Sequence, residues 1–176
     1  MKNCPLVRMR FFKHRATFCF SLLGVIVFYF IFHQLEQKIH GGLGIESLML
    51  QFTFSSNKFF EITSSWFPNG IEIWAKMLWL DMLFPFVYVI LLLSLLSRSR
   101  VSVIFFYQLS IFLGILDILE NSLHLMLIYQ SNHTILIPLA ATFATLKWIA
   151  IAAILIAVIA TLLYRYLSRS KPVRYE

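Results

Sequence analysis

Ionisable and polar side chains lie inside the long apolar runs of this sequence. Two aspartates, a glutamate and a lysine are placed there, together with an asparagine and a histidine: Asp81, Asp117, Glu120, Lys147, Asn121 and His124. A charged side chain at the centre of a membrane helix costs about 2.5–3.5 kcal/mol on insertion scales. Such groups therefore face the interior of a helix bundle, pair with one another, and often mark a binding site, a proton relay or an acid–base centre.

Polar and small residues of the third apolar run share one helical face. Their positions are separated by three, four, three, four and three residues: Tyr107, Ser110, Gly114, Asp117, Asn121 and His124. Steps of three and four keep side chains on one side of an α-helix. Glu120 lies beside this stripe, whereas Ile111 and Leu119 on the opposite side are apolar. The spacing therefore predicts a polar face that points into a bundle.

The second and fourth apolar runs carry matching groups. In the second run, Asp81, Pro85 and Tyr88 are spaced by four and three residues. Pro85 predicts a kink there, because proline removes one backbone hydrogen bond of the helix. In the fourth run, Lys147 follows small residues at helical spacing, and small residues let membrane helices approach closely. We therefore expect the second, third and fourth helices to enclose a common polar pocket.

Depth within the helices predicts which of these groups can meet. At about 1.5 Å per residue, Asp117 and Lys147 both lie about 20 Å from the outer ends of their helices. Glu120 lies about one turn nearer the outside, and Asp81 and His124 are higher still. We expect a funnel that opens outward, with Asp81 and His124 at its mouth and Asp117 and Lys147 at its floor.

The interior acids outnumber the single interior lysine. If all three are ionised and His124 is neutral, two negative charges are left over. Because uncompensated charge is costly at membrane depth, either one carboxyl is protonated or a bound cation compensates it. Alternatively, Lys147 pairs with an acid only to fix the helix register. The spacing of Asp81, Glu120 and His124 is no recognised metal-ligand pattern, so no metal site is predicted.

The composition is that of a membrane protein with several spans. Of 176 residues, 60% are hydrophobic and 13% are charged, and the apolar residues come in blocks long enough to cross a bilayer. We predict an all-α fold, a four-helix transmembrane bundle that forms a single membrane domain. Its helices are expected at about 16–33, 76–97, 101–130 and 134–166, with an outer loop at 34–75.

Basic residues gather on one side of the predicted spans. They precede the first helix, fill the link between the second and third, and follow the fourth: Lys2, Arg8, Arg10, Lys13, Arg15, Arg98, Arg100, Arg165, Arg169, Lys171 and Arg174. The positive-inside rule then predicts that both termini are cytoplasmic. Anionic lipid headgroups account for the net charge of +7, and no nucleic-acid partner is expected because no binding module is present.

The outer loop contains signals for a short amphipathic helix. The run Ser-Ser-Asn at 55–57 is typical of a helix start, Phe59 and Trp66 follow at helical spacing, and Pro-Asn-Gly at 68–70 is a turn. We expect this helix to lie on the outer membrane surface, with Trp66 and Trp74 at headgroup level. The alternative is a loop packed on top of the bundle.

Three short motifs carry most of the interior polar residues. They are L-D-x-x-F-P-x-x-Y at 80–88, D-x-x-E-N at 117–121 and T-x-K-W at 145–148. In this order they resemble a group of small, mostly bacterial four-helix integral membrane proteins, usually labelled uncharacterised. The resemblance covers about residues 52–165. It implies the four-helix architecture and the site positions, but no activity. We expect the chain to lie in the bacterial cytoplasmic (inner) membrane.

The sequence favours a binding or transport role. We expect an outward-facing pocket for a small cationic, proton-exchanging or lipid-derived ligand, with the bilayer as the other partner and no cofactor. The alternatives are a membrane-embedded enzyme that modifies a lipid or isoprenoid, with Glu120 or Asp117 as acid or base, and a non-catalytic assembly or accessory subunit. No catalytic residue is assigned. The candidates for binding and charge balance are Asp81, Tyr88, Asp117, Glu120, Asn121, His124 and Lys147.

Overall fold

The computed structural model describes residues 10–40, 46–101, 103–130 and 134–169, and throughout these ranges the fold is all-helical, as predicted. Several of the basic residues that were used to predict the orientation lie outside them: Lys2, Arg8, Lys171 and Arg174. In chain order the helices are α2 (Arg10–Lys13), α3 (Arg15–His40), α4 (Glu46–Gln51), α5 (Ser56–Ser64), α6 (Gly70–Asp81), α7 (Phe84–Ser99), α8 (Ile104–Tyr129) and α9 (Leu136–Arg169).

Within the described ranges, three helices are long and apolar enough to cross a membrane: α3, α8 and α9. The pair α6 and α7 passes the same test as one bent span, so there are three or up to four candidate spans. The predicted boundaries of the third and fourth helices, 101–130 and 134–166, lie within three residues of α8 and α9. The first helix is longer than predicted, because α3 continues from 33 to His40. The residues after 33 include Gln, Glu and Lys, which are good helix formers, so the helix continues beyond its apolar run.

The second predicted helix, at 76–97, is two helices in the structure. α6 begins earlier, at Gly70, and α7 ends at Ser99, with a bend of 42° between them. Pro85 is the second residue of α7, so the carbonyl of Asp81 has no N–H four residues ahead of it. The predicted kink is therefore confirmed, and it lies beside the aspartate.

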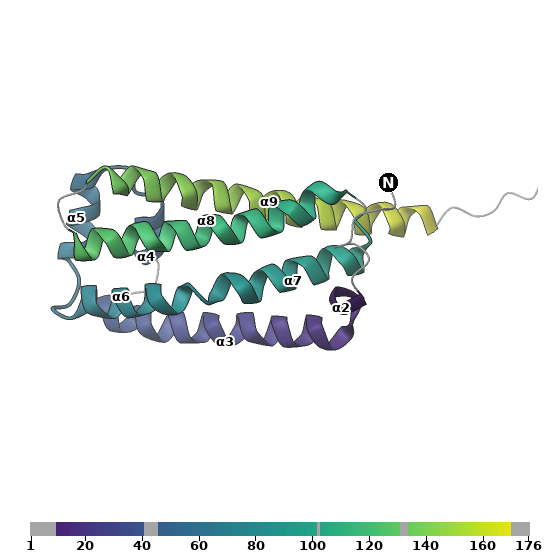
Figure 1. Ribbon diagram of the computed structural model, residues 1–176, viewed down its shortest axis with the longest axis horizontal. Coiled ribbons are helices and arrows are strands. Elements are labelled where there is room, and N and C mark those ends of the chain that lie inside the picture. Colours follow the sequence, from purple (N-terminus) through teal and green to yellow (C-terminus); the bar gives the residue numbers. More distant parts are fainter. Residues whose placement is uncertain (1–9, 41–45, 102, 131–133, 170–176) are drawn as a thin grey trace, which may run out of the picture.

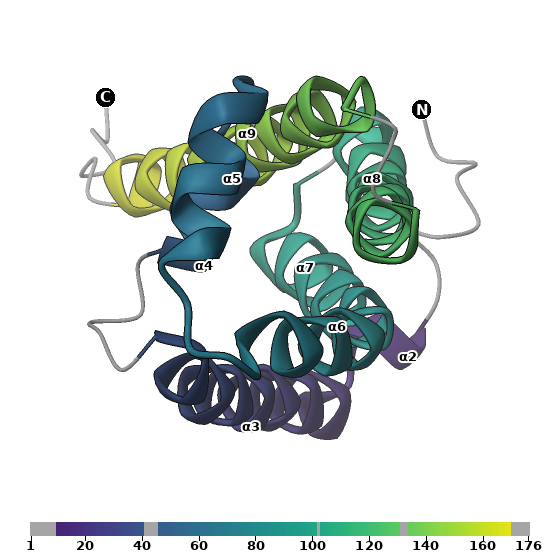
Figure 2. The same ribbon diagram turned by 90° about the vertical axis from the view of Figure 1, so that its left-hand side faces the viewer.

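The long helices lie side by side, as Figure 1 shows. α8 packs against α9, α3 packs against α6 and α7, and α7 packs against α8. Viewed end-on in Figure 2, α3 lies below α6 and α7, whereas α9 lies on the opposite side with α4 and α5 beside it. α2 and the last turns of α9 are at the same end of the molecule.

The apolar core consists of two separate clusters. One lies toward the α2 end and includes Leu96, Leu113 and Ile154. The other lies toward the α5 end and includes Ile39 and Leu125. Along α8 the polar residues 117–124 fall between the two clusters. A polar layer therefore interrupts the core near the middle of the bundle.

The segment between α3 and α6 packs on the protein. The predicted short helix is present as α5, and its Phe59 is buried. Trp66 and Trp74 are only 7% and 4% exposed, and their rings meet edge to face at 5.3 Å. The backbone N–H of Phe67 donates to the carbonyl of Ile39 at 2.9 Å, which ties the segment to α3. This is the arrangement of the alternative prediction, a segment packed on top of the bundle, because both indoles are buried in protein.

Candidate functional site

A buried ion network joins α7, α8 and α9. The Nζ atom of Lys147 lies 2.6 Å from Oδ1 of Asp117 and 2.6 Å from Oε2 of Glu120. The hydroxyl of Tyr88 donates to the other oxygen of Asp117 at 2.8 Å. Asp117, Glu120 and Lys147 are all buried. The prediction that Asp117 and Lys147 lie at the same depth therefore agrees with the structure.

Small residues bring the three helices close enough for this network. Ala140 and Ala144 are fully buried on α9, on the approach to Lys147. On α8, Gly114 precedes Asp117 by three residues, and a Cβ atom there would lie 2.8 Å from Cγ2 of Val89 on α7. Since real Cβ contacts are not that short, glycine is needed for α7 and α8 to pack at this distance.

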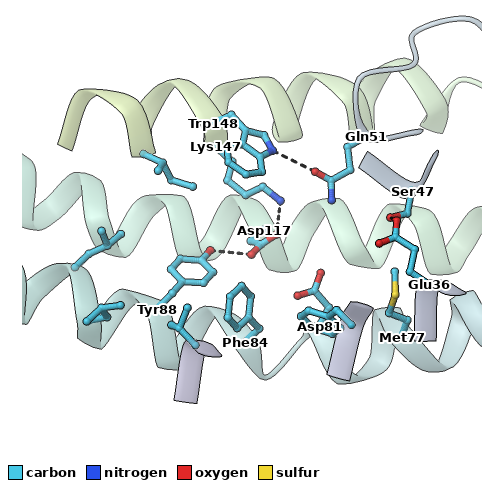
Figure 3. Close-up of a pocket in the computed structure, with 15 residues that line it drawn as sticks. Glu36, Ser47, Gln51, Met77, Asp81, Phe84, Tyr88, Asp117, Lys147 and Trp148 are labelled. Atoms are coloured by element: carbon cyan, nitrogen blue, oxygen red, sulfur yellow. Dashed lines mark hydrogen bonds and ion pairs between the residues drawn. The ribbon is translucent and has the colours of Figure 1, made fainter. Parts of the chain in front are cut away.

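A pocket of about 360 Å³ lies beside the network. Figure 3 shows Asp81, Tyr88, Asp117 and Lys147 directed into it from four different helices. The remaining lining residues come from α3, α4, α6, α7 and α9: Val25, Phe32, Glu36, Ser47, Gln51, Met77, Phe84, Leu91, Leu92, Trp148 and Ile151. Four of the seven predicted site residues thus meet at one cavity.

The short helix α4 crosses one end of the pocket and is hydrogen bonded on both sides. The hydroxyl of Ser47 donates to the carboxylate of Glu36 on α3. The indole N–H of Trp148 on α9 donates to Oε1 of Gln51 at 3.2 Å. Sequence reasoning missed Glu36 and Gln51, because both fall in the segment predicted as an outer loop. One signal was available, since Glu36 follows Val25 and Phe32 at 11 and four residues and so shares their face of α3.

Two pocket acids, Asp81 and Glu36, have no cation beside them among the described residues, and Glu36 already accepts a hydrogen bond from Ser47. The carboxylate of Asp81 forms no ion pair with any cation in the described ranges, whereas Asp117 is matched by Lys147. The side-chain amide of Asn121 approaches Asp81 from α8. However, the amide nitrogen of Asn121 makes no hydrogen bond of full geometry to a described residue. Asp81 is half-buried. Its carboxylate oxygens can therefore accept a hydrogen bond from a ligand in the pocket.

The three other predicted residues do not line the pocket: Glu120, Asn121 and His124. His124 was expected at the mouth of a funnel, but it is enclosed by aromatic rings. Its imidazole stacks on Phe59 at 6.5 Å between ring centroids and lies 5.3 Å from Trp74. Phe59 lies on α5, which folds back so that this ring meets His124, and the spacing along α8 alone does not encode that contact.

The charges around the pocket do not balance. Four carboxyl groups and one ammonium group gather here: Glu36, Asp81, Asp117, Glu120 and Lys147. If all are ionised, four negative charges against one positive charge leave an excess of three. Such an excess among buried groups is compensated by protonation or by a positively charged ligand. Among the residues that the structure describes, no group of three or more His, Cys, Asp or Glu side chains is arranged to hold a metal ion.

In comparisons with protein-family models, curated proteins and solved structures, nothing matches this chain. The resemblance of its three motifs to a group of small four-helix membrane proteins stays a prediction.

Proposed function

We propose that this chain is an integral membrane protein whose pocket binds a small organic cation at Asp81. In this proposal α3, the bent α6–α7 pair, α8 and α9 cross the bilayer as a four-helix bundle, in the bacterial cytoplasmic membrane, with both termini in the cytoplasm. Large apolar side chains on the outside support the membrane location, because Phe20 and Phe30 on α3 are 74% and 62% exposed.

The distribution of basic residues supports the orientation. Described cations at the α2 end are Lys13, Arg15, Arg98, Arg100 and Arg165. Arg165 also donates to the carbonyl of Ser99 at 3.5 Å, which confirms that α7 and α9 finish side by side. At the opposite end stand Lys38, Lys58 and Lys76, and Lys76 is paired with Glu72. Cytoplasmic segments are the ones rich in Lys and Arg.

The unpaired carboxylate of Asp81 carries the proposal. An ammonium group beside it forms a charge-assisted hydrogen bond and removes part of the excess negative charge. The aromatic rings of Phe32 and Phe84 line the same pocket and suit an organic cation better than a hydrated inorganic ion. On the cytoplasmic side, the apolar cluster of Leu96, Leu113 and Ile154 lies between the pocket and the basic end. The geometry therefore favours binding from one side over passage through the bundle.

Calorimetry on the full chain in lipid nanodiscs tests this proposal. We expect benzylammonium to bind, and benzoate and benzyl alcohol of the same shape to bind more weakly. Asp81→Asn should weaken benzylammonium binding at least tenfold, or about 1.4 kcal/mol. Glu72→Gln is the matched control, since Glu72 is an exposed acid on the same helix, α6. Equal affinity of the parent and Asp81→Asn, or no preference for the cation, would overturn the proposal.

A further inference from the structure

The pocket has a polar part and an apolar part. Its charged groups include Asp81, Asp117 and Lys147 on α6, α8 and α9, and Glu36 on α3 lies beside α4. Its apolar lining comes largely from α3, α7 and α9, and includes Val25, Phe32, Phe84, Leu91, Leu92 and Ile151. Most of these side chains are half-buried, because they face the pocket.

The apolar part of the pocket lies between α3 and α9, and we call the gap between these two helices the seam. α3 packs mainly on α6 and α7, and α9 packs mainly on α8, so α3 and α9 are not an extensively packed pair. Both nevertheless line the same pocket, through Val25 and Phe32 on one side and Trp148 and Ile151 on the other. Figure 2 shows the two helices on opposite sides of the bundle, with α4 between them at the near end.

The helix α4 closes the outer end of this seam. Ser47 is hydrogen bonded to Glu36 on α3, and Gln51 is hydrogen bonded to Trp148 on α9. The short helix α4 therefore bridges α3 and α9. Ser47 and Gln51 lie one turn apart on the face of α4 that lines the pocket. The outer, aqueous end is thus bridged by polar contacts, whereas the flank below α4 is lined by apolar side chains.

We propose that the ligand is a single-chain amphiphile with a primary amine head group, taken up from the bilayer between α3 and α9. This inference rests on the proposed function for its cationic group, and it adds the alkyl chain and the route. The ammonium group pairs with Asp81, and the chain passes Val25, Phe32 and Ile151 into the lipid beneath α4. A volume of about 360 Å³ is at the small end of ligand pockets, which run from about 300 to 1,000 Å³. It holds a head group and the start of one chain, with the rest of the chain in the bilayer.

A photoreactive amphiphile tests the route in nanodiscs. The probe is a long-chain primary amine with a diazirine near the end of its chain, compared with the alcohol of the same chain. We expect the amine to label peptides of α3 and α9, and Asp81→Asn to reduce this labelling at least tenfold. Equal labelling by amine and alcohol, or labelling that Asp81→Asn leaves unchanged, would overturn the inference.

Two tryptophan variants on α3 separate the route from the head-group site. Val25→Trp fills the seam, whereas Val27→Trp adds the same bulk on the outward side, where Val27 is 47% exposed. We expect Val25→Trp to abolish labelling by the long amine, whereas Val27→Trp leaves both this labelling and benzylammonium binding unchanged. If labelling survives in Val25→Trp while benzylammonium binds, the route is wrong and the proposed function stands. If neither amine binds to the parent chain, both proposals fail.

Discussion

The two polar regions around Lys147 are built from similar residues and differ in what covers them. In one region, Asp81, Tyr88 and Asp117 face a cavity beneath the short helix α4. In the other, Glu120 and His124 are enclosed, and aromatic rings of the α5 segment and α6 fill the space. A polar residue type alone therefore does not predict a binding site. A cavity remains where the covering segment only bridges the helices, as α4 does, whereas aromatic side chains fill the space around His124.

Removal of the lysine that both regions share should have the largest effect. Lys147→Met leaves Asp117 and Glu120 buried without a cation, and breaking a buried pair typically costs about 3–5 kcal/mol. Unfolding by denaturant in detergent micelles measures this loss. Lys76→Met is the control, because its pair with Glu72 is exposed to solvent and contributes little to stability. Equal effects of the two substitutions would show that the network contributes little to stability.

Loss of the tyrosine hydroxyl should have a smaller effect, confined to the pocket region. Tyr88→Phe removes the hydrogen bond to Asp117, and bonds to charged groups contribute about 1.5–3 kcal/mol. The same denaturation experiment measures it, with Tyr129→Phe as the control, because Tyr129 is 66% exposed. A change as small as that of the control would mean that Lys147 alone positions the Asp117 carboxylate.

Replacement of the enclosed histidine should have the smallest effect. His124→Phe keeps a flat ring between Phe59 and Trp74, and such near-isosteric swaps usually cost less than about 1.5 kcal/mol. Calorimetry should find benzylammonium affinity unchanged, in contrast to Asp81→Asn. If the affinity falls with His124→Phe, the imidazole reaches the ligand, and the distinction between the two regions around Lys147 is wrong.

The regular part of this arrangement could be predicted from spacing. The polar stripe of α8 and the equal depth of Asp117 and Lys147 follow from the helical period, and the bend follows from Pro85. The contacts of α4 and α5 could not be predicted in this way, because Gln51 and Phe59 reach α9 and His124 only after the chain folds back. Local periodicity carries no information on such long-range packing.

The ion network also constrains how the chain can be inserted into a membrane. α8 carries Asp117 and Glu120 at its centre, and their cation, Lys147, arrives only with the next helix. A translocating machinery that released α8 alone would leave two acids facing lipid. Because α8 ends at Tyr129 and α9 begins at Leu136, the two helices can leave it together as a hairpin with its charges already paired. In the proposed membrane topology, α8 and α9 therefore enter the bilayer as a pair rather than one after the other.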